Sequence, residues 1–200
     1  KKYQGHSRIS ACVAPHGTTT CSAGLLKAAW KLDDAFGAPF SLHTAEMDYE
    51  MDYFRKTSEQ TPAGYLDSLG VLGEHTLAAH CIQMTEADLQ LFAKRGASVA
   101  HCIGSNTKAA KGVAPVSRMR ELGILVGLGT DGPASGNTLD LFTQMKLFAN
   151  FHKNETRNRS AFPAWQVVEM ATAGGAKALH MEQKIGSIEV GKRADLVLVE

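Results

Sequence analysis

Residues 39–46, PFSLHTAE, decide how this 200-residue chain is interpreted. An apolar run ends there at His43, and Glu46 follows three residues later. Two further apolar runs end in the same way, TLAAH at His80 and ILVGLGTD at Asp131. Such runs, separated by helical patterns, are typical of successive strands in an α/β barrel, where residues at the C-terminal ends of different strands converge on one site. We therefore expect these four side chains to lie together.

The composition predicts one globular domain. The chain is 44% hydrophobic and 20% charged, which is enough apolar material for a large core. Its formal charge is +1 and it has no basic run, so nucleic acid is not an expected partner. No apolar stretch approaches the roughly 20 residues of a membrane helix, and no charged-then-apolar leader opens the chain. We expect no membrane association, a cytoplasmic location and four reduced cysteines, since no CxxC pair is present.

Short β-rich runs alternate with helical patterns along the chain. Strands are expected near residues 8–14, 39–44, 76–82, 97–102 and 124–130. Helices are expected near residues 22–36, 62–69, 85–95, 115–122, 138–153 and 163–179. The tail IGSIEVGKRADLVLV differs in character, and in it we expect two short strands on either side of a turn at Gly191-Lys192.

The strand–helix units are too few to close a barrel. Five units are predicted here, whereas a closed barrel of this kind needs eight strands and about 250 residues. An isolated five-stranded parallel sheet would also leave two edges unpaired. We expect an α/β fold of the (β/α)8 barrel type, incomplete in this chain, which supplies about strands four to eight. Residues 1–182 are assigned to the barrel and residues 183–200 to the start of a small β-sandwich.

Imidazole and carboxylate groups at strand ends suit a divalent metal ion that activates water. Asp131, flanked by glycines in GTDG, can bind a metal and accept a proton, although a turn aspartate that satisfies nearby amides is the alternative. A lone histidine such as His43 is more often a buried, hydrogen-bonded residue, but His80 at the equivalent position of the next strand favours a site. His101, which also ends a strand, is expected to be structural or to lie next to the substrate.

Several motifs, taken in order, resemble the amidohydrolase superfamily. They are APHGTTTCS, LHTAE, AHC, HCxxSNxK (His101 to Lys108), GLGTDGPAS and the closing IGSIEVGKRADLVLV. Within the superfamily they are most similar to the 5′-methylthioadenosine/S-adenosylhomocysteine deaminases and their relatives that act on aminated heterocycles.

The resemblance implies a role for each strand-end residue. His43 would be a metal ligand, and Asp131 would be both a metal ligand and a catalytic base. Glu46 would be the catalytic proton shuttle, and His80 would hydrogen-bond the nucleophilic water. The residues implied to contact the substrate are His16, Glu46 and Ser135.

The implied reaction is hydrolytic deamination of an aminated N-heterocycle, with an adenosine derivative such as 5′-methylthioadenosine or S-adenosylhomocysteine as substrate. One divalent metal ion is implied, zinc or else iron(II). The alternatives are a guanine or pterin deaminase and a triazine hydrolase that expels chloride or an alkylamine. Glu46 favours deamination, because an amine leaving group needs a proton more than chloride does. A noncatalytic barrel that serves as an assembly scaffold is the alternative from another functional class. Assembly into a homo-oligomer is also left open.

The superfamily also supplies an HxH pair of metal ligands from the first strand of the barrel, and no such pair occurs in these 200 residues. With His43 and Asp131 alone, zinc would lack two of the roughly three or four protein ligands of a catalytic site. We therefore expect this stretch of chain by itself to bind metal weakly and to be inactive.

Overall fold

The computed structural model describes residue 3 and residues 5–199, with the exception of the side chain of Asp34. Its centre is a four-stranded parallel sheet with the order β1-β2-β3-β4. The strands are β1 (Phe40–Thr44), β2 (Thr76–His80), β3 (Ser98–His101) and β4 (Val126–Leu128). Neighbouring strands in the sheet are also consecutive in the sequence, which is the arrangement of a partial barrel.

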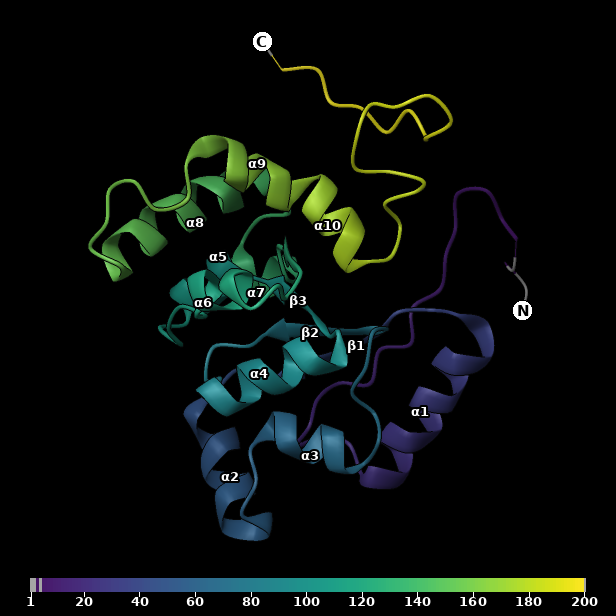
Figure 1. Cartoon of the computed structure of the whole chain (residues 1–200), viewed down its shortest axis with the longest axis vertical. Coiled ribbons are helices and arrows are strands. Elements are labelled where there is room, and N and C mark those ends of the chain that lie inside the picture. The colour runs from purple at the N-terminus through teal and green to yellow at the C-terminus, as the bar shows by residue number, and fades with distance from the viewer. Residues whose placement is uncertain (1–2, 4, 200) are drawn as a thin grey trace.

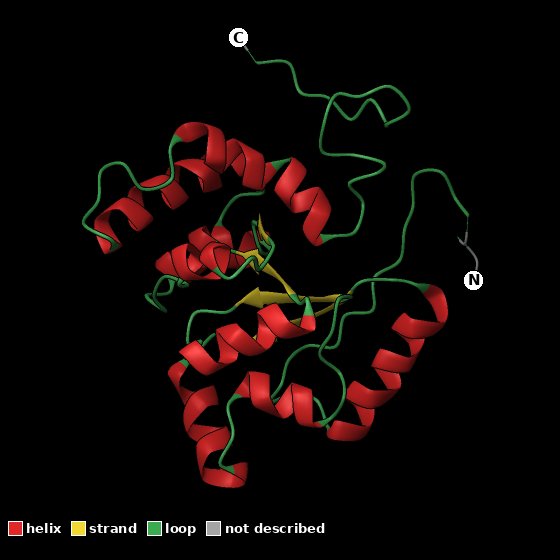
Figure 2. Cartoon of the chain, viewed as in Figure 1, coloured by secondary structure: helices red, strands yellow, loops and turns green. Residues whose placement is uncertain are grey.

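Helices connect the strands and cover them (Figure 2). They are α1 (Ala23–Phe36), α2 (Asp48–Ser58), α3 (Pro62–Ser68), α4 (Glu86–Arg95), α5 (Ile103–Lys108), α6 (Val116–Glu121), α7 (Pro133–Gly136), α8 (Leu141–Glu155), α9 (Ala164–Ala171) and α10 (Ala173–Ala178). In the view of Figure 1, α1 to α4 lie on one side of the strands and α8 to α10 on the other. No helix in the described part of the chain is long and apolar enough to cross a bilayer.

Local capping signals fix the helix ends where the sequence predicts them. The Ser22 side chain accepts a hydrogen bond from the amide of Leu25 at 3.2 Å and so begins α1. Gly37 ends the same helix in the left-handed conformation, with φ 58°. Thr85 and Asp88 form the capping box that begins α4.

The hydrophobic core lies between the strands and their covering helices. One face of β1 is buried through Phe40 and Leu42, and Phe92 of α4 packs into the same core cluster. Phe148 of α8 and Met170 of α9 belong to this cluster and are fully buried. The side chains that alternate with the buried face of β1 are only half-buried, and His43 is one of them.

Several expected elements differ in the structure. Residues 8–14 form no continuous strand; Val13 and Gly17 make isolated parallel bridges to Phe40 and His43. The helix expected over 163–179 is interrupted at Thr172, where φ is −125° and ψ is −96°. Residues 104–106, expected as a loop, belong to α5, and α2 occupies a stretch in which no helix is expected.

The two strands expected in the tail are absent from residues 183–199. The backbone bonds found there are local, such as the Lys192 amide to the Glu189 carbonyl at 3.2 Å. A strand needs a neighbour to satisfy its backbone groups, and in the described chain no other segment pairs with these residues. Their apolar side chains are exposed accordingly, at Ile188, Val190, Leu196, Val197, Leu198 and Val199.

Candidate active site

The structure brings His43, His80 and Asp131 together at the carboxyl edge of the sheet, and Glu46 and His16 lie beside the two imidazoles. The His43 and His80 rings, from the ends of β1 and β2, are stacked with centroids 5.3 Å apart and an interplanar angle of 15°. Asp131 follows β4, and both imidazoles act on its carboxylate electrostatically. The expectation that residues of separate strands converge here is therefore met.

The chain leaves these strands through left-handed backbone conformations. Ala45 has φ 49°, His80 has φ 70°, Cys81 has φ 51° and Asp131 has φ 58°. A residue other than glycine seldom adopts such values, which cost of order 1–3 kcal/mol and cluster at functional sites. The bend at Ala45 lies between His43 and Glu46, two of the residues that are expected to lie together.

A backbone carbonyl orients the His43 ring. Its Nδ1 lies 2.5 Å from the carbonyl oxygen of His16. Because a carbonyl only accepts hydrogen bonds, Nδ1 carries a proton in this contact, which directs Nε2 toward the site as the nitrogen that would bind a metal. His16 is exposed beside this ring, with centroids 4.8 Å apart, and its own Nδ1 contacts the Thr20 hydroxyl at 2.7 Å.

His80 is held more deeply, with 1% of its surface exposed. Its Nδ1 lies 2.7 Å from Oδ1 of Asn106, an amide oxygen that accepts the hydrogen bond. Its Nε2 lies 3.5 Å from Oε1 of Glu46. Burial lowers the pKa of His80, and this outweighs the opposing effects of Asn106 and Glu46. A neutral imidazole with Nδ1 protonated presents Nε2 as an acceptor for a water molecule.

The Asp131 carboxylate is stabilised in its charged form. Burial raises its pKa, but the Ser105 hydroxyl, the Gly132 amide at 2.7 Å and the imidazoles of His80 and His43 together lower it below the ordinary value. An ionised carboxylate at this position can bind a cation or accept a proton.

Glu46 forms an ion pair with Lys111, which the sequence interpretation does not anticipate. The Lys111 ammonium contacts Oε1 of Glu46, the oxygen that faces His80. Both side chains of the ion pair are 17% exposed. Lys111 lies 65 residues from Glu46 in the sequence, so no local pattern signals the pair. Asn106 belongs to the HCxxSNxK motif, which is the one sequence signal for a polar residue at this position.

Ser135 and His101 make no hydrogen bond to His43, Glu46, His80 or Asp131 in the part of the chain that the structure describes. Ser135 is half-buried in α7, and its amide donates to the Gly132 carbonyl at 3.0 Å. The described chain shows no hydrogen bond between Ser135 and the other predicted site residues. His101 is fully buried, with its Nε2 3.2 Å from that of His152, and its ring meets Phe148 edge-on. This supports the structural alternative for His101.

The metal-binding groups are incomplete within the described chain. No group of three or more His, Cys, Asp or Glu residues there is arranged to hold a metal ion. The two expected ligands suit one nonetheless, because the Nδ1 contact of His43 leaves its Nε2 for a metal and the surroundings of Asp131 favour its charged form. The residues present therefore fit part of a metal site.

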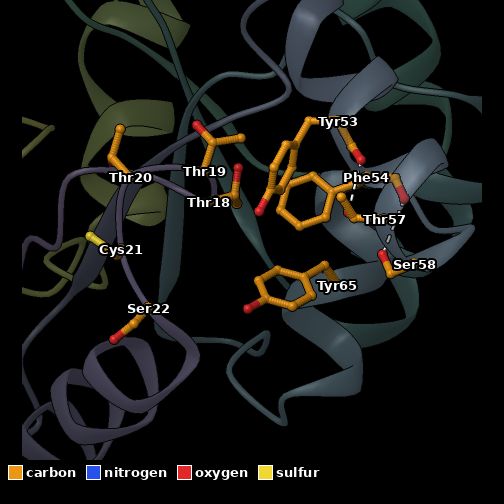
Figure 3. Close-up of a pocket in the computed structure, with 10 residues that line it drawn as sticks. All are labelled: Thr18, Thr19, Thr20, Cys21, Ser22, Tyr53, Phe54, Thr57, Ser58 and Tyr65. Atoms are coloured by element: carbon orange, nitrogen blue, oxygen red, sulfur yellow. Dashed lines mark hydrogen bonds between the residues drawn. The ribbon is translucent and has the colours of Figure 1, made fainter.

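A separate cavity of about 410 Å³ lies between residues 18–22 and the helices α2 and α3 (Figure 3). Residues 18–22 form one wall, and Tyr53, Phe54 and Tyr65 face them from α2 and α3. None of the six predicted site residues lines this cavity.

Comparisons with known proteins agree with this geometry. The family model described as "Amidohydrolase family" matches residues 1–200. A protein of Syntrophobacter fumaroxidans named 5-methylthioadenosine/S-adenosylhomocysteine deaminase is 42% identical over 192 residues, which are 96% of this chain and 44% of that protein. A Methanosarcina barkeri protein named 5′-deoxyadenosine deaminase is 40% identical over 193 residues, which are 96% of this chain and 44% of the relative.

A solved structure extends the likeness to three dimensions. An adenosine deaminase from Xanthomonas campestris with bound zinc superimposes with a TM-score of 0.93 and 36% sequence identity. The match covers 97% of this chain and 44% of that one. The chain thus spans less than half the length of these relatives.

Proposed function

The chain belongs to the amidohydrolase family, and on that basis we propose that the protein is a metal-dependent hydrolase that deaminates adenosine derivatives. The observation that carries the proposal is the stacked His43–His80 pair beside Glu46 and the ionised Asp131 at one edge of the sheet. The relatives whose names specify deamination of such compounds support the choice of substrate. A closed (β/α)8 barrel and a small β domain begun by residues 183–200 are part of the same proposal.

Two groups of this chain would hold the divalent metal ion, Nε2 of His43 and the carboxylate of Asp131. The ion, zinc or else iron(II), supplies a water molecule whose pKa is lowered toward about 7. Further protein ligands are proposed to lie outside these 200 residues, because two are too few for a catalytic site.

The chain's own residues would manage the protons. His80, neutral and fixed by Asn106, accepts a hydrogen bond from the attacking water at Nε2. Asp131 accepts the proton that this water loses. Lys111 and His80 both face Oε1 of Glu46, which leaves Oε2 to serve the ring nitrogen next to the amine-bearing carbon. A proton delivered through Glu46 allows ammonia to leave.

The proposal is tested by ammonia release from the full-length protein loaded with zinc. The substrates are 5′-methylthioadenosine, S-adenosylhomocysteine and 5′-deoxyadenosine, with guanine and a chlorinated triazine as competing classes. We expect ammonia from the adenosine derivatives, and a loss of about 100-fold or more in the E46Q and D131N variants. The matched control is E155Q, since Glu155 is an exposed carboxylate at the end of α8. Release of chloride alone, or of ammonia from none of these rings, would refute the assignment.

A further inference from the structure

Glu50 is a buried carboxylate in the first turn of α2, with 4% of its surface exposed. Its Oε1 accepts hydrogen bonds from the backbone amides of Glu46 at 2.9 Å and Met47 at 3.1 Å. Its Oε2 accepts a third from the hydroxyl of Thr18 at 3.1 Å. One side chain therefore joins the bend at Glu46 and Met47 to Thr18, which lies 32 residues from Glu50 in the sequence.

Only part of this arrangement is ordinary helix capping. The bond from the Met47 amide is the one that a capping box provides. Asp88 plays the equivalent part in α4, where it accepts from the Thr85 amide at 2.9 Å and from the Thr61 hydroxyl. Glu50 also holds the amide of Glu46 itself, which a capping box does not explain.

The two segments that Glu50 joins both lead to the candidate site. Glu46 follows the left-handed residue Ala45, so its amide lies at the bend that aims its side chain. Thr18 is two residues beyond His16, whose carbonyl fixes the ring of His43. Movement of either segment would displace a group that the proposed reaction uses.

We propose that Glu50 is a positioning residue that sets the place of Glu46 and, through Thr18, the orientation of His43. This inference rests on the proposed function, since it assigns those two residues to the reaction. Glu50 itself touches neither substrate nor metal. A displacement of about 1 Å in a reacting group can cost roughly 100-fold in rate. The three hydrogen bonds that Glu50 accepts are therefore called the anchor, and their removal is expected mainly to lower kcat.

The test compares four variants of the zinc-loaded full-length protein. E50A removes all three hydrogen bonds of the anchor. E50Q keeps an oxygen for the two amides and places an NH2 group that can donate to the Thr18 hydroxyl. T18V removes only the hydrogen bond from the Thr18 hydroxyl to Glu50, which is the link toward His16. D88A is the matched control, because it removes a buried capping carboxylate that contacts none of the site residues.

We expect E50A to lower kcat/KM per folded molecule by about 10- to 100-fold. E50Q should recover most of this loss, and T18V should lose less than E50A. D88A should lower stability while kcat and KM stay within about twofold of the parent. Hydrogen exchange gives a readout that is independent of activity: the amides of Glu46 and Met47 should exchange faster in E50A and not in D88A.

The outcomes separate the two proposals. If the parent protein deaminates none of the adenosine derivatives, the proposed function fails, and the exchange rates of the Glu46 and Met47 amides alone judge the anchor. Unchanged exchange in E50A would overturn the inference. If the parent is active, a kcat/KM for E50A equal to that of D88A would overturn it as well. If E50A does not fold, E50Q and T18V are compared with D88A in its place. Unchanged hydrogen exchange of residues 16–20 in T18V would contradict the proposed link from Glu50 through Thr18 to His43.

Discussion

The buried contact between His101, the last residue of β3, and His152 of α8 predicts that the protein loses stability in mild acid. The two Nε2 atoms lie 3.2 Å apart, so only one of them carries a proton in this contact. Phe148 and Phe162 surround the ring of His152, which is 2% exposed. Burial lowers the pKa of His152 to about 4 from an ordinary value of 6.5. Burial also lowers the pKa of His101, and repulsion between the two rings adds to the effect.

The direction of this pH dependence follows from the protons that the folded and the unfolded protein bind. Below pH 6.5 the unfolded chain takes up a proton at residue 152, whereas the folded protein takes it up only near the lowered pKa of about 4. Stability therefore falls as the pH decreases through this window, by about 1.4 kcal/mol per pH unit, and the loss levels off below it. The whole contribution of His152 is about 3 kcal/mol.

Urea unfolding followed by circular dichroism, at several pH values from 7 to 4, measures this effect in the parent and in H152Q. Glutamine keeps a side-chain donor for His101 but does not titrate. The difference in unfolding free energy between the two proteins should shift by about 3 kcal/mol in favour of H152Q as the pH falls. Carboxylates elsewhere contribute equally to both proteins and cancel. Parallel curves for the parent and H152Q would refute the reasoning.

Three further predictions concern packing and buried polar groups. Gly127→Ala places a Cβ 2.9 Å from the α10 backbone, so it should lower the free energy of unfolding in urea by about 1–3 kcal/mol. The control is Gly24→Ala, whose Cβ meets nothing closer than 4.0 Å, and its free energy of unfolding should not fall. Asn106→Ala leaves Nδ1 of His80 buried without its acceptor and should cost about 1–3 kcal/mol; a change below about 0.5 kcal/mol would contradict this. Burial raises the pKa of the Cys102 thiol to about 12, so mass spectrometry after iodoacetamide treatment at pH 7 should find it alkylated only once the protein is unfolded.

Local signals account for the parts of the fold that the sequence predicts well. Ser22 and Gly37 mark the ends of α1 because capping depends on residues within one turn of the helix. The strands β1 to β4 are predicted from short apolar runs in the same way. In α2 the apolar pattern is weaker, since Glu50 and Phe54 are its only buried residues among those described, and the sequence predicts no helix there.

Long-range contacts decide the parts that the sequence leaves open. The ion pair of Glu46 with Lys111 depends on how a loop after α5 returns to the end of β1, and no residue spacing encodes that return. The tail is similar, because the pattern around Gly191 favours strands only where another strand pairs with it. Convergence of His43, His80 and Asp131 could be predicted because parallel strands bring their carboxyl ends to one edge.

The residues with a left-handed backbone at the ends of the strands carry backbone strain, and two of them, His80 and Asp131, also carry side chains that the proposed reaction uses. Glycine adopts such a conformation without steric cost, so Ala45→Gly should relieve strain while it leaves the neighbouring side chains in place. The same replacement at His80 or Asp131 would relieve comparable strain and delete a functional group. At His80 the replacement would also leave a cavity and break the buried hydrogen bond to Asn106, so of these three positions only Ala45 could lose its strain to glycine without the loss of a group that the site uses.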